Sequence, residues 1–260
     1  EIAPYLKFTV TDEEGNAIRR LCSRPSKGMN RLTWDLRYAS TSPVRKSDGK
    51  FDPFSSGGSG LFVMPGNYRV SLSMVAGGET RELAGPVEFK AAPLNNTTLP
   101  APDRGALVAF QREVASLTRV VQGTQRYMNE LSDKLAIMMQ AVHQTPEASP
   151  ELKSHMYQLS LQMDDIRYSF YGKTPKASRE ENPPAPVSIN ERMGNLIYAF
   201  YGTTSAPTTT MRRSYEIIRE EFPPLHAKLK QIGTVDIPAL ETEMEKAGVP
   251  WTPGRLPEWE

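Results

Sequence analysis

The hydrophobic pattern of the chain changes within residues 91–114, AAPLNNTTLPAPDRGALVAFQREV. Before this stretch apolar and polar residues alternate, which is typical of a strand with one face in a core and the other in water. After it, apolar residues recur at spacings of three and four, which is typical of an amphipathic helix. Three prolines separate the two patterns and indicate a linker. The sequence therefore predicts an α+β protein of two domains.

The first domain, residues 1–94, is predicted to be a small antiparallel sandwich of the immunoglobulin type (Ig-like). Its short alternating segments are separated by turn-forming sequences, DEEGN at 12–16, MPGN at 64–67 and AGG at 76–78. The segment GMNRLTWDLRY at 28–38 alternates apolar and charged residues and predicts another strand. Its tryptophan is expected to fill the space between two sheets, with a hydrogen-bond partner for the indole N–H. The predicted structural core comprises Leu32, Trp34, Leu36, Tyr68 and Val70.

Residues 95–104 form the predicted linker, and residues 105–260 a predicted antiparallel bundle of helices. Apolar seams, Ser149 as an N-cap and Ser188 with Glu191 as a capping box set the expected helix boundaries. Pro223-Pro224 is expected to break or kink the fourth helix, and Gly248 to stop the fifth. The expected helices span about 105–143, 149–171, 188–201, 209–232 and 237–247.

Two segments of the helical domain are similar, YSFYGKTP at 168–175 and YAFYGTTSAP at 198–207. Each is expected to end a helix at Phe-Tyr-Gly, which by itself explains the similarity. The second interpretation is an interaction surface made by their tyrosines. That candidate surface comprises Tyr168, Tyr171, Tyr198 and Tyr201.

Composition gives little indication of a ligand. Lysine and arginine number 31 and aspartate and glutamate 30, so the net charge does not favour nucleic acid. Cys22 has no catalytic partner in a known motif, and the three histidines lack the spacing of metal ligands. The sequence therefore predicts no catalytic residue, no cofactor and no metal site. No stretch is apolar enough to predict a membrane span.

Several segments together resemble one family. They are FTVTDEEGNAIRRL at 8–21, GMNRLTWDLRY at 28–38, MPGNYRVSL at 64–72, SINERMGNLIYAF at 188–200, SYEIIREEFPPLHAKLKQI at 214–232 and DIPALETEMEKAGVP at 236–250. This order resembles the C-terminal region of large bacterial secreted proteins with sortilin-like BNR-repeat β-propellers, often labelled glycosyl hydrolases. In that family a propeller precedes an Ig-like sandwich of the flagellar-hook-cap type and a helical tail. The resemblance implies a C-terminal fragment of a longer protein, secreted or in the bacterial cell envelope.

The leading functional hypothesis is a non-catalytic scaffold or docking module, not an enzyme on its own. The implied partner is its own upstream β-propeller or another envelope protein. One alternative is an accessory part of a propeller hydrolase, with the Gly/Ser-containing loop at 40–60 as a lid. Another is a carbohydrate-binding module that uses exposed tyrosines to hold a glycan. The sequence leaves open the parent reaction, the identity of the partner and the oligomeric state.

Overall fold

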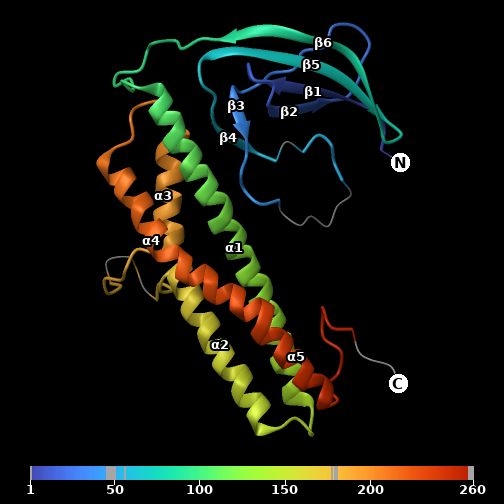
Figure 1. Cartoon of the computed structure of the whole chain (residues 1–260), viewed down its shortest axis with the longest axis vertical. Helices are drawn as coiled ribbons and strands as arrows, with labels where there is room; N and C mark the ends of the chain where they lie inside the picture. Colours follow the sequence, from blue (N-terminus) through green and yellow to red (C-terminus); the bar gives the residue numbers. More distant parts are fainter. Residues whose placement is uncertain (1, 45–50, 56, 177, 179–180, 257–260) are drawn as a thin grey trace. The chain divides into compact units, whose positions relative to one another are not determined.

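A computed structural model describes residues 2–44, 51–55, 57–176, 178 and 181–256, and it has an α+β fold (Figure 1). The chain divides into two compact units, Glu1–Ser116 with Ile197–Thr208 and Leu117–Leu196 with Thr209–Glu260. Helices α1 (Arg104–Gln144) and α3 (Ile189–Tyr201) each contribute residues to both units. The predicted linker at 95–104 leads into α1, and the domain boundary assigned there stays a prediction.

The first unit contains a four-stranded antiparallel sheet in the order β2-β1-β5-β6. The strands are β1 (Tyr5–Thr11), β2 (Ala17–Ser23), β5 (Gly66–Ala76) and β6 (Glu79–Ala91). A cluster of buried side chains lies on this sheet, and partly buried aromatic and aliphatic side chains pack against it. The cluster comprises Val10, Ile18, Tyr68 and Ala91, with Trp34, Tyr38, Val63, Val70 and Phe89 around it.

Two of the predicted turns join these strands. The Asp12 carboxylate accepts a hydrogen bond of 2.7 Å from the Asn16 backbone N–H in the turn between β1 and β2. Gly77 and Gly78 join β5 to β6 with φ values of 57° and 82°. A two-residue hairpin turn of this kind needs positive φ at both positions, which glycine adopts without steric cost.

The segment 28–38 differs from its predicted strand. The only strand residues that the structure assigns near it are those of β3 (Arg37–Ala39). Leu36 has a φ of 56°, which is incompatible with an extended backbone. Leu32 and Leu36, both predicted to be core residues, are 37% and 42% exposed. Charged residues between apolar ones therefore did not indicate a strand here, because the chain bends at Leu36 before it pairs.

β3 pairs with a strand that the sequence did not predict, β4 (Ser59–Phe62), at the end of the long Gly/Ser-containing segment. The expected long loop from 40 to 60 is therefore wrong for its last residues. Residues 45–50 and 56 of that predicted loop lie outside the described residues. The sequence SGLF is too short and too rich in small residues to show an alternating pattern, so only pairing with β3 identifies it.

The helices agree closely with their predicted boundaries. Besides α1 and α3 they are α2 (Pro150–Tyr171), α4 (Thr209–Gln231) and α5 (Ile237–Lys246). In the second unit α2 contacts both α4 and α5, and its seam is buried from Leu152 to Phe170. The Ser149 hydroxyl accepts a hydrogen bond from the Leu152 N–H, which confirms the predicted N-cap.

α4 runs through Pro223-Pro224 without a break, over nearly the expected span of 209–232, so of the two expected effects a break is wrong and a kink stays a prediction. The Phe222 ring beside them is buried and contacts the Phe170 ring edge to face, with the centroids 6.4 Å apart. Burial of this ring favours the helical path although neither proline can donate a backbone hydrogen bond. The helix then continues through a π-helical turn, Ile232–Asp236, into α5.

Candidate functional site

A groove of about 330 Å³ in the first unit is the candidate functional site, and we call it the Gln111 groove. Four parts of the chain line it: Leu36 with residues 62–65, residues 91–97, the first turns of α1, and Thr203 with Thr204. Most of these side chains are apolar. A concave apolar surface with a few polar groups is the usual form of a binding site for a small ligand or a short peptide.

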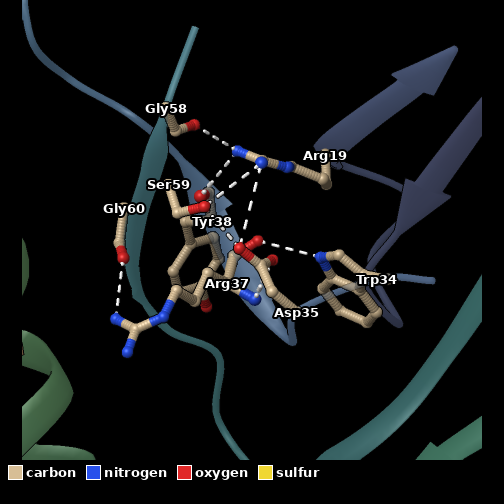
Figure 2. Close-up of polar contacts among 8 residues, drawn as sticks. All are labelled: Arg19, Trp34, Asp35, Arg37, Tyr38, Gly58, Ser59 and Gly60. Atoms are coloured by element: carbon tan, nitrogen blue, oxygen red, sulfur yellow. Dashed lines mark hydrogen bonds and ion pairs between the residues drawn. The ribbon is translucent and has the colours of Figure 1, made fainter. Parts of the chain in front are cut away.

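The β3–β4 pair that supplies one wall is fixed by two buried arginines. Arg19 is 5% exposed and Arg37 8% exposed. Figure 2 shows the Arg19 guanidinium beside Gly58 and Ser59, where it donates a hydrogen bond of 2.8 Å to the Gly58 carbonyl. The Arg37 guanidinium donates to the Gly60 carbonyl at 3.1 Å (Figure 2). These bonds compensate for the desolvation of the two charges and hold β4 in place.

Arg37 also connects this wall to the end of α3. Its guanidinium lies 3.6 Å from the Phe62 ring centroid and 4.1 Å from that of Tyr201. Its Nη2 donates a hydrogen bond of 2.9 Å to the Tyr201 carbonyl. A planar guanidinium can stack on aromatic rings and donate in its own plane at the same time. Arg37 therefore positions Phe62, which lines the groove.

The groove contains one buried polar side chain without a protein partner. Gln111 is 4% exposed, lines the groove, and makes no side-chain hydrogen bond to any other described residue. Its amide can donate two hydrogen bonds and accept two. The two amide atoms are not among the buried, unpaired side-chain atoms of the described residues, so they are reached from the groove and are available to a ligand there.

Arg104, at the start of α1, is the other strongly polar residue of the lining. Its Nη2 lies 3.4 Å from the Asn95 Oδ1, a long hydrogen bond to a neutral group. Asn95 has a φ of 54°, a left-handed conformation that asparagine tolerates better than most residues. Among the residues that the structure describes, no aspartate, glutamate, histidine or cysteine belongs to the lining. The groove therefore carries one formal charge, and it is positive.

Of the predicted core residues, Tyr68, Val70 and Trp34 differ in burial and in the contacts they make. Tyr68 is 4% exposed, and its hydroxyl donates a hydrogen bond to the Met64 carbonyl. Val70 packs against the buried cluster. Trp34 is partly buried, with its ring edge to face against Tyr68 at 5.7 Å, and its indole N–H donates to the Arg37 carbonyl at 3.0 Å. The expected partner of the indole N–H is therefore a backbone carbonyl close in sequence.

The four tyrosines of the predicted interaction surface are exposed by 47%, 43%, 84% and 49% in chain order. Tyr168 and Tyr171 belong to the second unit, Tyr198 and Tyr201 to the first, so a single surface made by all four stays a prediction. The Tyr171 hydroxyl accepts hydrogen bonds from Gln125 at 2.8 Å and Asn129 at 3.1 Å. Tyr201 contacts Arg37, as described above. Tyr198 is the most exposed of the set.

Two side chains of the sheet have raised pKa values. Burial raises the pKa of Tyr68 to about 12, and the nearby Tyr38 adds to this effect. Burial also raises the pKa of the Cys22 thiol, against a smaller opposing effect of Lys7. Both groups therefore remain protonated and uncharged at neutral pH, in which form they pack against apolar neighbours.

Sequence reasoning missed Arg104, Gln111 and the groove. One signal was present: Gln111 is four residues after Leu107 and three before Val114, so it is a polar residue on the apolar face of a helix. Within the described part of the chain, no three His, Cys, Asp or Glu side chains are grouped as metal ligands would be. Among the same residues, none of the helices has the length and hydropathy of a membrane span.

Comparisons with known proteins do not identify the site. No protein-family model, no curated protein and no solved structure matches the chain.

Proposed function

We propose that the chain is a non-catalytic docking module of a larger secreted or cell-envelope β-propeller protein. In this proposal the Gln111 groove receives a segment of the upstream propeller or of another envelope protein. The groove supports recognition because its lining combines apolar walls, one amide and one cation. General acid–base catalysis would need a group that titrates near neutral pH, and the groove lining contains none.

We further propose that the fold has the finer form implied by the resemblance. The first unit would be an Ig-like sandwich in which the β3–β4 pair belongs to the second sheet. The helices of the second unit would form an antiparallel bundle. The antiparallel order β2-β1-β5-β6 and the buried seam of α2 support this assignment.

The observation that carries the docking proposal is the unpaired amide of Gln111 inside an apolar groove. The amide atoms are reached from the groove and make no hydrogen bond to a described residue, so a ligand in the groove can pair with them. A polar side chain on an otherwise apolar helix face, at a concave surface, is expected where a ligand pairs with it. Docking of a partner segment would supply the missing hydrogen bonds.

Photocross-linking in the cells that produce the protein tests this proposal. Leu94 lines the groove and is 86% exposed, so a photoreactive p-benzoylphenylalanine at this position would face a docked partner. Val87, on β6 and 59% exposed, is the matched control outside the groove. We expect one discrete adduct from position 94, none from position 87, and loss of the adduct when Gln111→Leu is added.

Two outcomes would contradict docking at the groove. One is an adduct pattern at position 94 no different from that at position 87. The other is an adduct that Gln111→Leu leaves unchanged. Mass spectrometry of the adduct would distinguish the protein's own upstream segment from a separate envelope protein, and both results support docking.

A further inference from the structure

The polar and apolar groups of the Gln111 groove follow one stripe of α1. Arg104, Leu107, Val108 and Gln111 all line the groove, and their spacing of three, four and seven residues places them on one face of the helix. Seven residues of helix extend about 10 Å along the axis. An extended peptide advances about 3.3 Å per residue, so about three residues would span the distance from Arg104 to Gln111.

The positive charge at the N-terminal end of the stripe indicates which ligand group binds there. Arg104 is the one charged residue of the lining, and its contact with the neutral Asn95 side chain leaves its charge uncompensated. The N-terminus of α1 is already capped, since the Asp103 carboxylate accepts a hydrogen bond of 2.9 Å from the Ala106 N–H. An anionic group in the groove would therefore bind to the Arg104 guanidinium, which forms short bidentate contacts with carboxylates.

The other end of the stripe indicates a backbone partner. Gln111 is 4% exposed, its amide atoms are reached from the groove, and a carboxamide can donate to a peptide carbonyl while it accepts from a peptide N–H. Between the two ends, Leu107 and Val108 present an apolar surface that fits one aliphatic side chain. A volume of about 330 Å³ is at the small end of ligand sites, which favours a chain end over a chain that continues in both directions.

We propose that the Gln111 groove binds the free C-terminus of a partner protein as an extended segment of about three residues. Its terminal carboxylate pairs with Arg104, its penultimate aliphatic side chain packs on Leu107 and Val108, and the backbone of the third residue from the end pairs with Gln111. This inference rests on the proposed docking function and specifies the partner segment.

Fluorescence anisotropy of labelled peptides with the purified chain tests the inference. The probe is fluorescein-Gly-Ser-Gly-Ala-Leu-Ala with a free carboxylate, compared with the same peptide as its C-terminal carboxamide. We expect the carboxamide to bind about tenfold more weakly, because it loses a charge-assisted pair. Arg104→Gln should weaken the free acid by about the same factor and leave the carboxamide unchanged.

Two further variants complete the design. Gln111→Leu should weaken both peptides about equally and should not lower the melting temperature of the free chain, because leucine extends the apolar face of α1; a loss of binding is then not a loss of the fold. Arg119→Gln, an exposed arginine on the same helix outside the groove lining, is the matched control and should change neither affinity.

Three results would overturn the inference. They are equal affinity of the acid and the carboxamide, the absence of binding at millimolar peptide, and equally tight binding of an internal acidic segment, Gly-Ser-Gly-Ala-Leu-Asp-Gly-Ser-amide. None of them affects the cross-link at Leu94, which tests docking without assuming a chain end. Failure of the peptide experiment with an intact groove-dependent cross-link would therefore reject the C-terminal ligand and retain the docking function.

Discussion

Replacement of Arg37 by alanine should destabilise the first unit strongly. The substitution removes two hydrogen bonds from a charged donor, at 3.1 Å to the Gly60 carbonyl and 2.9 Å to the Tyr201 carbonyl. It also removes the contacts of the guanidinium with two rings. Hydrogen bonds to charged groups contribute about 1.5–3 kcal/mol each, but water can solvate part of the freed carbonyls. We expect a loss of about 3 kcal/mol in the free energy of unfolding.

The assay is urea unfolding followed by the fluorescence of Trp34, with Trp251 and Trp259 replaced by phenylalanine. In that background the remaining tryptophan lies in the first unit and reports its unfolding. With an m-value of about 2 kcal/mol/M, the loss corresponds to a decrease of about 1.5 M in the urea midpoint. Arg20→Ala, an exposed arginine on β2, is the matched control and should shift the midpoint little.

Arg37→Lys distinguishes the geometry of the guanidinium from its charge. Lysine keeps the positive charge but cannot stack on two rings and donate from a fixed fork, so we expect about half of the loss to remain. The assignment of Arg37 as the residue that holds the groove wall would be refuted by one result. In that result the urea midpoints of Arg37→Ala and Arg20→Ala shift by amounts equal within 0.2 M, or about 0.4 kcal/mol at the m-value above.

Three further predictions concern stability. A Cβ at Gly233 would overlap the hydroxyl end of the partly exposed Tyr127 side chain, which must then move, so Gly233→Ala should destabilise by about 1 kcal/mol, whereas Gly123→Ala, with no atom within 4 Å, should stabilise by about 0.5–1 kcal/mol in thermal melts. Ser149→Ala should cost about 1 kcal/mol through loss of the N-cap, as measured by urea unfolding followed by circular dichroism. The pKa of Tyr68 is about 12 in the folded state against an ordinary value of 10.0, so its contribution to stability is complete below pH 10 and is lost as the pH rises through 12. Unfolding followed by Trp34 fluorescence over this pH range should show the decrease, and Tyr68→Phe should reduce it.

The helices could be predicted from sequence because their determinants are local. Each apolar seam repeats within one segment, and capping residues such as Ser149 act on amides three residues away. The strand predicted at 28–38 failed for the opposite reason. Its alternation is real, but the left-handed conformation of Leu36 and the pairing of Arg37 with Phe62 depend on residues distant in sequence.

The Gln111 groove could not be assembled from sequence, because segments more than 150 residues apart in the chain, from Leu36 to Thr204, line it. The sequence did contain a local signal of the groove, a glutamine on the apolar face of α1. Local rules predict a leucine or valine at such a position, and departures from local rules are expected at functional sites. A systematic search for polar residues on apolar helix faces would have selected Gln111 as a candidate.

The similar Phe-Tyr-Gly sequences at the ends of α2 and α3 end their helices through different interactions. After α2, Gly172 has a φ of 73°, and its N–H donates to the Tyr168 carbonyl at 2.7 Å, as the glycine stop predicts. After α3, Gly202 does not take the left-handed conformation. There the Tyr201 carbonyl accepts from Arg37 instead, and a cation at a helix C-terminus also interacts favourably with the helix dipole. The same Phe-Tyr-Gly sequence therefore ends one helix by itself and ends the other through β3, which explains why the end of α3 belongs to the strand-rich unit.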